Sequence, residues 1–244
     1  MSGSLPEELA GLSRLEEIDF DGNLNIVGKI PTAFGLLEDL ERLDLDNNQI
    51  SGSIPETLYE VDSLTTIDLN DNMLTGTLSP SLADLDRLRI LMLENNMLTG
   101  TLVSEIGELD RMVFLTLDNN DLVGSIPSAW SDLINLQALT LHNNAGITGT
   151  IPTFLGDFDD LRLLSLFNTN MSGSIPTELG ELDQLDTLFL HNTNFVGTMP
   201  QEICDLRTFN NGEDGRSLQR LTADCAGDNP RVVCPQPTCC TGCF

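Results

Sequence analysis

All six cysteines of the chain lie in its last 41 residues, where they could form disulfide bonds or a metal site. An even number of cysteines clustered at one end is typical of a disulfide-bonded cap in a secreted protein. The pairing stays open among 15 combinations, although a bond between the adjacent Cys239 and Cys240 is geometrically disfavoured. The alternative is a zinc site, because Cys240 and Cys243 have C-x-x-C spacing. We predict three disulfides among Cys204, Cys225, Cys234, Cys239, Cys240 and Cys243.

Carboxylates are the most abundant ionisable groups, with 38 acidic residues against 11 basic ones and a net charge of −27. This charge disfavours nucleic acids and anionic membranes as partners. It is compatible with a basic protein, with divalent cations or with a role in solubility alone. The sequence has no run of 18 apolar residues, so we expect no transmembrane helix in it, and it shows no secretory signal.

The two histidines, His142 and His191, are the remaining candidates for acid–base or metal chemistry. They occupy equivalent positions two units apart in the repeat described next, which places them roughly 10 Å apart by strand spacing. That separation is too long for a catalytic dyad or a shared metal. Neither a cysteine nucleophile motif nor a glycine-rich phosphate loop is present. We therefore predict a binding protein and not an enzyme.

A repeat of 24 or 25 residues positions both histidines and many of the carboxylates. Its pattern, L-x-x-L-x-L-x-x-N-x-L-x-G-x-I-P, runs through residues 40–55 and returns at 136–152. The L-x-L segment predicts a short strand with its leucines inward, and the asparagine is expected to bond the backbone of neighbouring turns. Thr169 and Thr193 replace that asparagine in the last two repeats, and two insertions follow the asparagine position near Asn25 and Ala145. Trp130 occupies a leucine position and is predicted to be core.

The x-G-x-I-P tail resembles the plant-type class of leucine-rich repeats, which occurs in plant receptor kinase ectodomains and polygalacturonase inhibitors. The resemblance covers residues 5–200. It implies an α/β solenoid: a right-handed superhelix with a concave parallel β-sheet and short 3₁₀ and β segments on the convex side. Residues 221–244 resemble the C-terminal end of secreted or membrane-anchored leucine-rich repeat proteins of diatoms, which implies an extracellular or cell-surface location.

Two parts are therefore expected, a solenoid over residues 1–203 and a cysteine-rich cap over residues 204–244. The chain begins with Ser2-Gly3-Ser4-Leu5-Pro6, which matches the tail of a repeat. Solenoids need capped ends, so we expect a fragment of a longer protein. The preceding part could hold a signal or a membrane anchor.

Outward strand positions of a solenoid form a continuous binding surface. Repeats four to eight gather apolar and aromatic side chains there, which is typical of a surface that contacts a partner. We predict that a protein, peptide or glycan binds Ile90, Met92, Phe114, His142, Leu163, Phe167, Phe189 and His191. Repeats one to three are acidic and form a possible zone for a cation or a basic partner: Asp19, Asp21, Asp44, Asp46 and Asp68.

Two alternative functions remain open from the sequence. A column of mostly Ser and Thr on the outer side could bind ice or a polysaccharide: Lys29, Ser53, Thr77, Thr101, Ser125, Thr150, Ser174 and Thr198. The acidic columns could instead serve calcium-dependent adhesion, because calcium favours clustered carboxylates. Asn170-Met171-Ser172 is an N-glycosylation sequon, so we also expect that Asn170 can carry a glycan.

Overall fold

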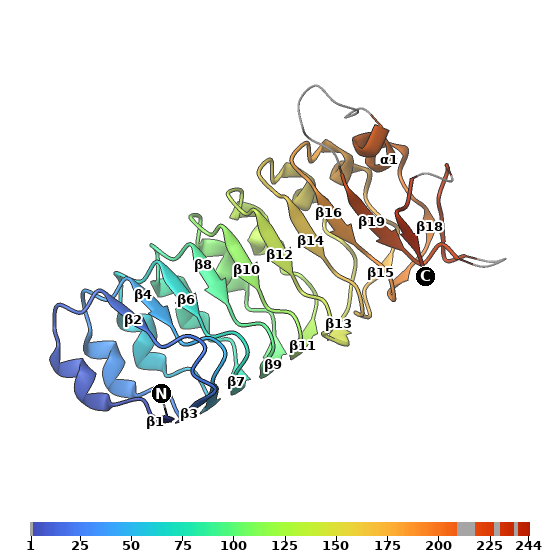
Figure 1. The fold of residues 1–244 in the computed structure, drawn as a ribbon. Coiled ribbons are helices and arrows are strands. Elements are labelled where there is room, and N and C mark those ends of the chain that lie inside the picture. Colours follow the sequence, from blue (N-terminus) through green and yellow to red (C-terminus); the bar gives the residue numbers. More distant parts are fainter. Residues whose placement is uncertain (1, 209–217, 227–229, 237–238) are drawn as a thin grey trace.

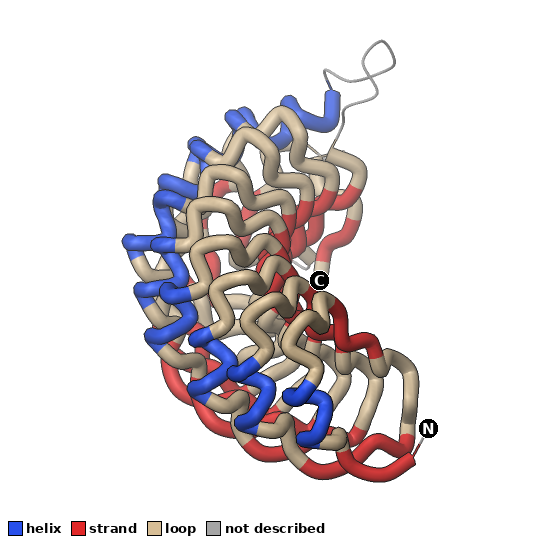
Figure 2. The backbone as a smooth tube through the Cα atoms, turned by 90° about the vertical axis from the view of Figure 1, so that its left-hand side faces the viewer, coloured by secondary structure: helices blue, strands red, loops and turns tan. Residues whose placement is uncertain are grey.

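The computed structural model describes residues 2–208, 218–226, 230–236 and 239–244. These residues form a leucine-rich repeat solenoid, in which a parallel sheet lines one side of the curve and 3₁₀ helices lie on the other side (Figures 1 and 2). The predicted fold class is confirmed. We number the coils 1 to 8 after their strands in that sheet. Among the described residues, no helix is both long and apolar enough to cross a membrane.

The concave sheet has ten strands, all parallel. Coils 1 to 8 contribute β2 (Glu17–Asp19), β4 (Arg42–Asp44), β6 (Thr66–Asp68), β8 (Ile90–Met92), β10 (Phe114–Thr116), β12 (Ala138–Thr140), β14 (Leu163–Ser165) and β16 (Thr187–Phe189). The C-terminal segment adds β19 (Arg220–Ala223) and β21 (Gly242–Cys243). The cap therefore continues the sheet of the solenoid.

A second sheet of seven parallel strands runs along the coils: β1 (Ser2–Ser4), β3 (Asn25–Gly28), β5 (Gln49–Gly52), β7 (Met73–Thr77), β9 (Met97–Thr101), β11 (Asp121–Gly124) and β13 (Gly146–Ile147). Two short pairs follow it: β15 (Ser172–Gly173) with β17 (Asn194–Phe195), and β18 (Gly197–Thr198) with β20 (Val232–Val233). We call the surface of these strands the outer strand face.

Eight 3₁₀ turns lie between the outer strands and the next strand of the concave sheet; six of them begin directly after a proline, η4 begins at Pro80, and η5 follows Val103. The turns are η1 (Glu7–Gly11), η2 (Thr32–Leu36), η3 (Glu56–Glu60), η4 (Pro80–Asp84), η5 (Ser104–Glu108), η6 (Ser128–Asp132), η7 (Thr153–Asp157) and η8 (Thr177–Glu181). The helix α1 (Gln201–Thr208) follows coil 8 and packs against η8. It spans the predicted boundary at residues 203 and 204, and the division into two domains stays a prediction.

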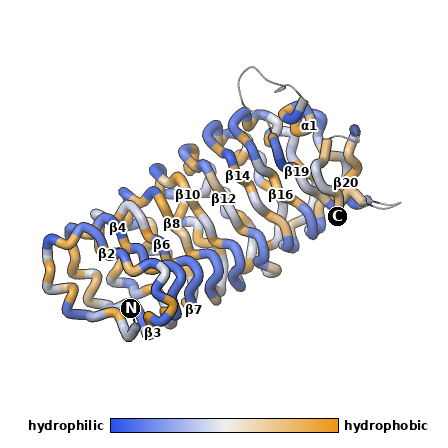
Figure 3. The backbone as a smooth tube through the Cα atoms, in the orientation of Figure 1, coloured by the Kyte–Doolittle hydropathy of each residue, from blue (hydrophilic) through white to orange (hydrophobic). Residues whose placement is uncertain are grey.

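Leucines of the L-x-L segments fill one continuous core, so hydrophobic and hydrophilic residues recur at the same place in every coil (Figure 3). Trp130 is 1% exposed, as predicted, and its indole N–H donates to the Val103 carbonyl at 2.9 Å. The asparagine position also behaves as predicted. Asn96 Nδ2 donates to the carbonyl oxygens of Leu93 in its own coil and Leu69 in the coil before.

The asparagine ladder is interrupted where the sequence departs from the pattern. In regular coils the side-chain Oδ1 accepts a backbone N–H from the preceding coil, as Asn72 does from Ile50. The insertion in coil 1 diverts the N–H of Ile26 to the carbonyl of Asn23, so the buried Oδ1 of Asn48 has no partner. In coil 7, Thr169 bonds only the Leu166 carbonyl of its own coil. The threonine position of coil 7 was expected from the sequence to weaken the ladder, whereas the loss at Asn48 was not expected.

The cap contains three disulfides, Cys204–Cys239, Cys225–Cys243 and Cys234–Cys240. The predicted number is confirmed, the pairing that the sequence left open is resolved, and Cys239 and Cys240 bond to different partners. The Sγ atoms of Cys225, Cys234, Cys240 and Cys243 lie within 4.8 Å of one another, so two of the disulfides are neighbours.

Candidate functional site

Outward side chains on the concave face form three columns that cross the coils in the register that the repeat predicts. The first column holds the first residue of each strand, the middle column holds the third residue, and the third column holds the residue two positions after the strand. Strand pairing places Ile90 beside Phe114 in the first column and Ser165 beside Phe189 in the middle column. Backbone hydrogen bonds set the third column, where the Asn143 and Asn168 N–H groups donate to the Phe167 and His191 carbonyls. Each column therefore crosses the coils, and its side chains are neighbours in space although 24 or 25 residues separate them in the chain.

The third column ends in a continuous stack of rings that we call the aromatic ladder: His142, Phe167, His191 and Phe244. Successive ring centroids are 4.2, 4.6 and 4.3 Å apart, with interplanar angles of 20°, 9° and 25°. Phe189 from the middle column meets Phe167 and His191 edge-on. The ladder joins coils 6 to 8 to the C-terminal residue.

Hydrogen bonds hold both histidines of the ladder in place. The two nitrogens of His142 lie 3.1 Å from the Ser165 hydroxyl and 3.2 Å from the Asp118 carboxylate. His191 Nδ1 lies 2.7 Å from the Thr222 hydroxyl. Burial lowers the pKa of both histidines, and the neighbouring carboxylates only partly oppose that effect. The ladder is therefore uncharged at neutral pH, in a protein whose surface is otherwise strongly acidic.

Structure divides the predicted binding residues into two patches. Ile90, Met92 and Phe114 meet on β8 and β10. The buried Ala138 and Thr140 of β12 then separate them from the remaining residues. Those lie in coils 6 to 8: His142, Leu163, Phe167, Phe189 and His191.

The predicted binding residues are less exposed than their outward positions indicated. The apolar side chains on this face were expected to stand exposed, yet all eight predicted binding residues are half-buried. Neighbouring coils lie close enough for their rings to cover one another, as the ladder does. The patch therefore offers its outer rim to solvent, and the rings also contribute to packing.

The acidic zone is less uniformly solvated than its composition indicated. Asp19 and Asp21 are exposed, but Asp44 is only 5% exposed. Arg42 contacts the carboxylates of Asp44 at 2.5 Å and Glu17 at 3.3 Å. It is the one arginine or lysine that forms an ion pair in the described part of the chain. Burial, together with repulsion from neighbouring carboxylates, raises the pKa of Asp68 to about 6.

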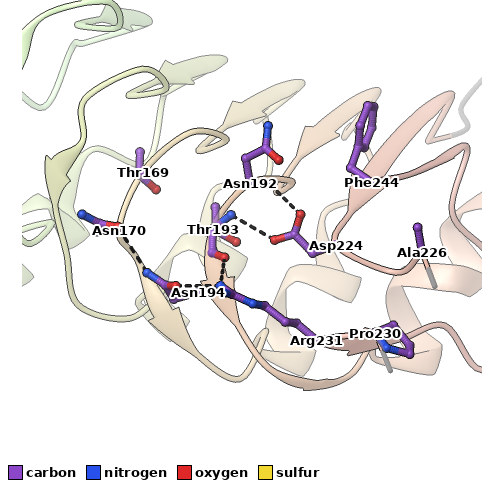
Figure 4. A pocket seen from close by; sticks show the side chains of 10 residues that line it. All are labelled: Thr169, Asn170, Asn192, Thr193, Asn194, Asp224, Ala226, Pro230, Arg231 and Phe244. Carbon is purple, nitrogen blue, oxygen red and sulfur yellow. Dashed lines mark hydrogen bonds between the residues drawn. The ribbon is translucent and has the colours of Figure 1, made fainter. Parts of the chain in front are cut away.

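Figure 4 shows a polar hollow where coils 7 and 8 meet the cap. The Asp224 carboxylate accepts the backbone N–H groups of Asn192 at 2.6 Å and Thr193 at 3.0 Å. Arg231 donates to the Thr193 carbonyl and to Asn194 Oδ1. These polar groups mainly attach the cap to coil 8.

Asn170 stands exposed at the rim of this hollow, where its Nδ2 donates to the Ala145 carbonyl. The glycosylation of Asn170 stays a prediction.

Sequence reasoning missed the residues that complete the ladder. Phe244 follows the last cysteine and has no place in the repeat, so no periodicity indicated its position. Thr222 and Asp118 were not singled out as partners of the histidines. Leu218 and Leu221 repeat the L-x-x-L spacing of the coils, which is a sequence signal that the cap continues the concave sheet.

Hydroxyl side chains line the outer strand face as the sequence indicated. Ser53, Thr77, Thr101, Ser125, Thr150, Ser174 and Thr198 are all exposed. Glycines flank this column, because the backbone there has positive φ, which other residues rarely adopt. At Gly100, which has φ +81°, an added Cβ would lie 2.7 Å from Thr77 Cγ2. A second hydroxyl column includes Thr99, which donates to the Gly76 carbonyl.

Comparison with known proteins places the repeats among leucine-rich repeats. Residues 13–74 and 39–98 match the family model described as leucine rich repeat. No curated protein matches the sequence. The resemblance of the C-terminal segment to diatom proteins finds no support in these comparisons.

Solved structures show similar solenoids. The crystal structure of a TDR receptor is 34% identical over 84% of this chain, with a TM-score of 0.80. The ectodomain of the Arabidopsis receptor kinase HAESA, in complex with an extended IDA peptide hormone, is 28% identical over 97% of this chain, with a TM-score of 0.82. This chain spans 35% and 41% of those two chains. A plant ice-binding protein is 26% identical over 82% of this chain and 71% of that one, with a TM-score of 0.67.

Proposed function

Since the chain is a plant-type leucine-rich repeat protein that resembles receptor ectodomains, we propose that it is an extracellular module that binds a peptide or protein segment on its concave face. The similar HAESA ectodomain is in complex with a peptide hormone. The three disulfides support an extracellular location. We place the contact on coils 4 to 8, where the two apolar patches lie.

The observation that carries this proposal is the aromatic ladder with Phe189 beside it. Stacked rings cover one another's faces, so the ladder presents ring edges, which carry partial positive charge. Such edges favour carbonyl oxygens, and Phe189 and Leu163 offer apolar surface next to them. An extended peptide segment that crosses the coils can satisfy both surfaces. Its backbone carbonyl oxygens would contact the ring edges of the ladder, and one of its apolar side chains would contact Phe189.

We expect Phe189→Ala to weaken binding about 30-fold, because burial of one ring at an interface contributes about 2 kcal/mol. Binders are first selected from a displayed library of unstructured peptides, with the unmodified protein as the target. The Kd of each selected peptide is then measured for the unmodified protein and for each variant. Phe189 is preferable to Phe167, which stacks on both His142 and His191. Replacing Phe167 would also cost stability, because its ring packs between the two histidine rings.

Phe154→Ala is the matched control, because Phe154 is equally half-buried but lies in η7 on the convex side, near Phe158. It should leave every Kd unchanged. Binders that respond equally to Phe154→Ala and Phe189→Ala, or to neither, would place the contact elsewhere and contradict the proposal.

A second candidate function is adsorption to ice or to a polysaccharide through the outer strand face. The specific observation is the column of exposed Ser and Thr hydroxyls after the glycines, with further hydroxyls such as Ser51 and Thr99 before them, in a fold similar to a plant ice-binding protein. The hydroxyls of Thr99 and Ser51 donate to glycine carbonyls, which restrains their orientation.

If the outer strand face binds ice, Thr101→Arg should abolish inhibition of ice recrystallisation. The long arginine side chain would keep the neighbouring hydroxyl groups from contacting the ice surface. Ser128→Arg adds the same side chain on η6, away from that face, and should have no effect. If the unmodified protein does not slow ice recrystallisation, ice binding is excluded as a candidate function.

A further inference from the structure

Three arginines line one hollow at the rim of the concave face, in a chain whose net charge is −27. The hollow has a volume of about 460 Å³, and most of its residues come just before β8, β10 and β12, which are neighbouring strands (Figure 1). We call it the arginine hollow, and its lining residues are Thr65, Arg87, Arg89, Arg111, Val113, Asn135, Gln137 and Asp160.

Stacking of the coils brings these arginines together. The backbone N–H of Arg89 donates to the Thr65 carbonyl at 2.9 Å, and the N–H of Val113 donates to the Arg89 carbonyl at 2.7 Å. Arg111 comes two residues before Val113, at the position that Arg87 holds in the preceding coil. The arginine side chains therefore start from neighbouring coils, which are about 4.8 Å apart, and are long enough to reach one shared ligand.

Protein carboxylates do not neutralise the arginine hollow. In the described part of the chain, the ion pairs involve Arg42 and His142, and no side-chain hydrogen bond reaches Arg87, Arg89 or Arg111. All three are exposed. Like charges from neighbouring coils repel one another, and a bound anion would relieve this repulsion.

The acidic groups around the hollow lie toward its two ends. Asp160 of coil 7 lines one end. At the other end Arg87 also borders a separate hollow that is rich in carboxylates: Glu16, Glu38, Asp39, Glu41 and Asp62. Arg89 and Arg111 therefore provide the positive charge at the centre of the arginine hollow.

Polar and apolar groups next to these arginines narrow the class of ligand. The half-buried Gln137 makes no side-chain hydrogen bond to other described residues, so its amide N–H groups are available as donors. Arg89 directly precedes Ile90, and Val113 directly precedes Phe114, so the hollow borders the first apolar patch. A ligand that fits both surfaces carries an anionic group on an apolar or aromatic body.

We propose that the arginine hollow binds an oxyanionic group of a ligand, a carboxylate or a phosphate or sulfate ester, through Arg89 and Arg111 with Gln137 as a further donor. Guanidinium groups bind both kinds of oxyanion with paired N–H donors. Small-molecule sites have volumes of about 300–1,000 Å³, so a hollow of about 460 Å³ holds the oxyanion together with part of the body that carries it.

The site lies on coils 4 to 6, whereas Phe189 and the end of the aromatic ladder lie on coil 8 and the cap. It can therefore be tested with small ions, whether or not a peptide binds the ladder. The strongly negative charge of the whole chain repels anions, so saturable anion binding indicates a local site.

The test follows the arginine Nε–Hε signals by NMR while sodium acetate, phosphate or sulfate replaces sodium chloride at constant ionic strength, in the oxidised protein at mildly acidic pH. We expect the Arg89 and Arg111 signals to shift saturably. Each small ion forms few contacts, so its Kd should be on the order of 1–10 mM. Stronger binding of acetate would identify a carboxylate ligand, and stronger binding of phosphate or sulfate would identify an ester.

Arg89→Gln and Arg111→Gln remove the charge but keep the length of the side chain. Each should weaken anion binding about tenfold, measured on the signal of the remaining arginine, because a charge-assisted hydrogen bond is lost. The signal that disappears in each variant also assigns the spectrum. Both positions are exposed, and circular dichroism checks that each variant is folded.

Arg14→Gln is the matched control, because Arg14 is exposed and holds in coil 1 the repeat position of Arg87 and Arg111. Three strand spacings, about 14 Å, separate it from coil 4 and exceed the Debye length of about 10 Å at 0.1 M salt. Its replacement should therefore change the affinity less than about twofold.

The proposal is overturned if none of the three anions shifts the Arg89 and Arg111 signals saturably at concentrations up to about 100 mM, tenfold above the weakest expected Kd. It is equally overturned if Arg14→Gln weakens binding as much as Arg111→Gln does, because that result indicates a general effect of net charge.

Discussion

Reduction of the three disulfides is expected to unfold the C-terminal end of the solenoid while the central coils stay folded. Cys204–Cys239 ties α1 to the cap, and Cys225–Cys243 ties β19 to β21. β19 covers the edge of β16, where Leu188 pairs with Leu221. Without the disulfides no covalent cross-link would join α1, β19 and β21, and each coil is stabilised mainly by its neighbours. Hydrogen exchange should therefore rise first in coil 8 and the cap.

The size of the effect should follow the length of the closed loop. Cys204–Cys239 spans 35 residues and Cys234–Cys240 spans six. Chain entropy predicts stabilisations of about 4 and about 2 kcal/mol. Pairwise replacement by serine tests this, with Cys204/Cys239 expected to cost more than Cys234/Cys240. Equal exchange in all coils after reduction, or no change in the cap, would contradict the expectation. Free thiols in the oxidised protein, measured by intact mass after alkylation, would refute the pairing.

Asn120→Ala is the other change with a large expected effect, a loss of at least about 3 kcal/mol of unfolding free energy. Asn120 Nδ2 donates to the carbonyl oxygens of Leu93 and Leu117, and its Oδ1 accepts the N–H of Leu98. All of these groups are buried, so alanine would leave several backbone groups unpaired at about 1–3 kcal/mol each. Chemical denaturation under oxidising conditions measures the loss.

Thr169→Val is the matched comparison, because Thr169 occupies the same position in coil 7 and bonds only the Leu166 carbonyl of its own coil. It should cost about 1 kcal/mol, the typical net value of one hydrogen bond. If the two substitutions cost the same, the bonds between coils do not contribute as the ladder geometry implies.

The concave face places chemically different zones along one sheet. Coils 1 to 3 carry the carboxylates of the acidic zone, whereas coils 6 to 8 carry the uncharged aromatic ladder. A ligand that lies across the coils would meet both, so the charge of its two ends should matter. A basic residue at one end and an apolar residue at the other would match this polarity.

Repeat periodicity alone was sufficient to predict the coils, the parallel sheet, the inward leucines and the asparagine ladder with its weak positions. These features follow from the residues within one repeat of 24 or 25 residues, because the alternation of apolar and polar residues along a strand sets which side chains point inward. The columns of the concave face followed as well, since stacking identical units brings equivalent positions together. The number of disulfides followed from an even cysteine count at one end.

Only the tertiary structure decided the features that depend on distances between coils or between a coil and the cap. The sequence placed Phe167 and Phe189 on the concave face, but the close approach of successive coils made them half-buried. Phe244 joined the ladder because β21 extends the sheet beyond β19, and no repeat pattern indicated β21. The same close packing selected one disulfide pairing, because pairing depends on which residues from distant parts of the chain are neighbours in space.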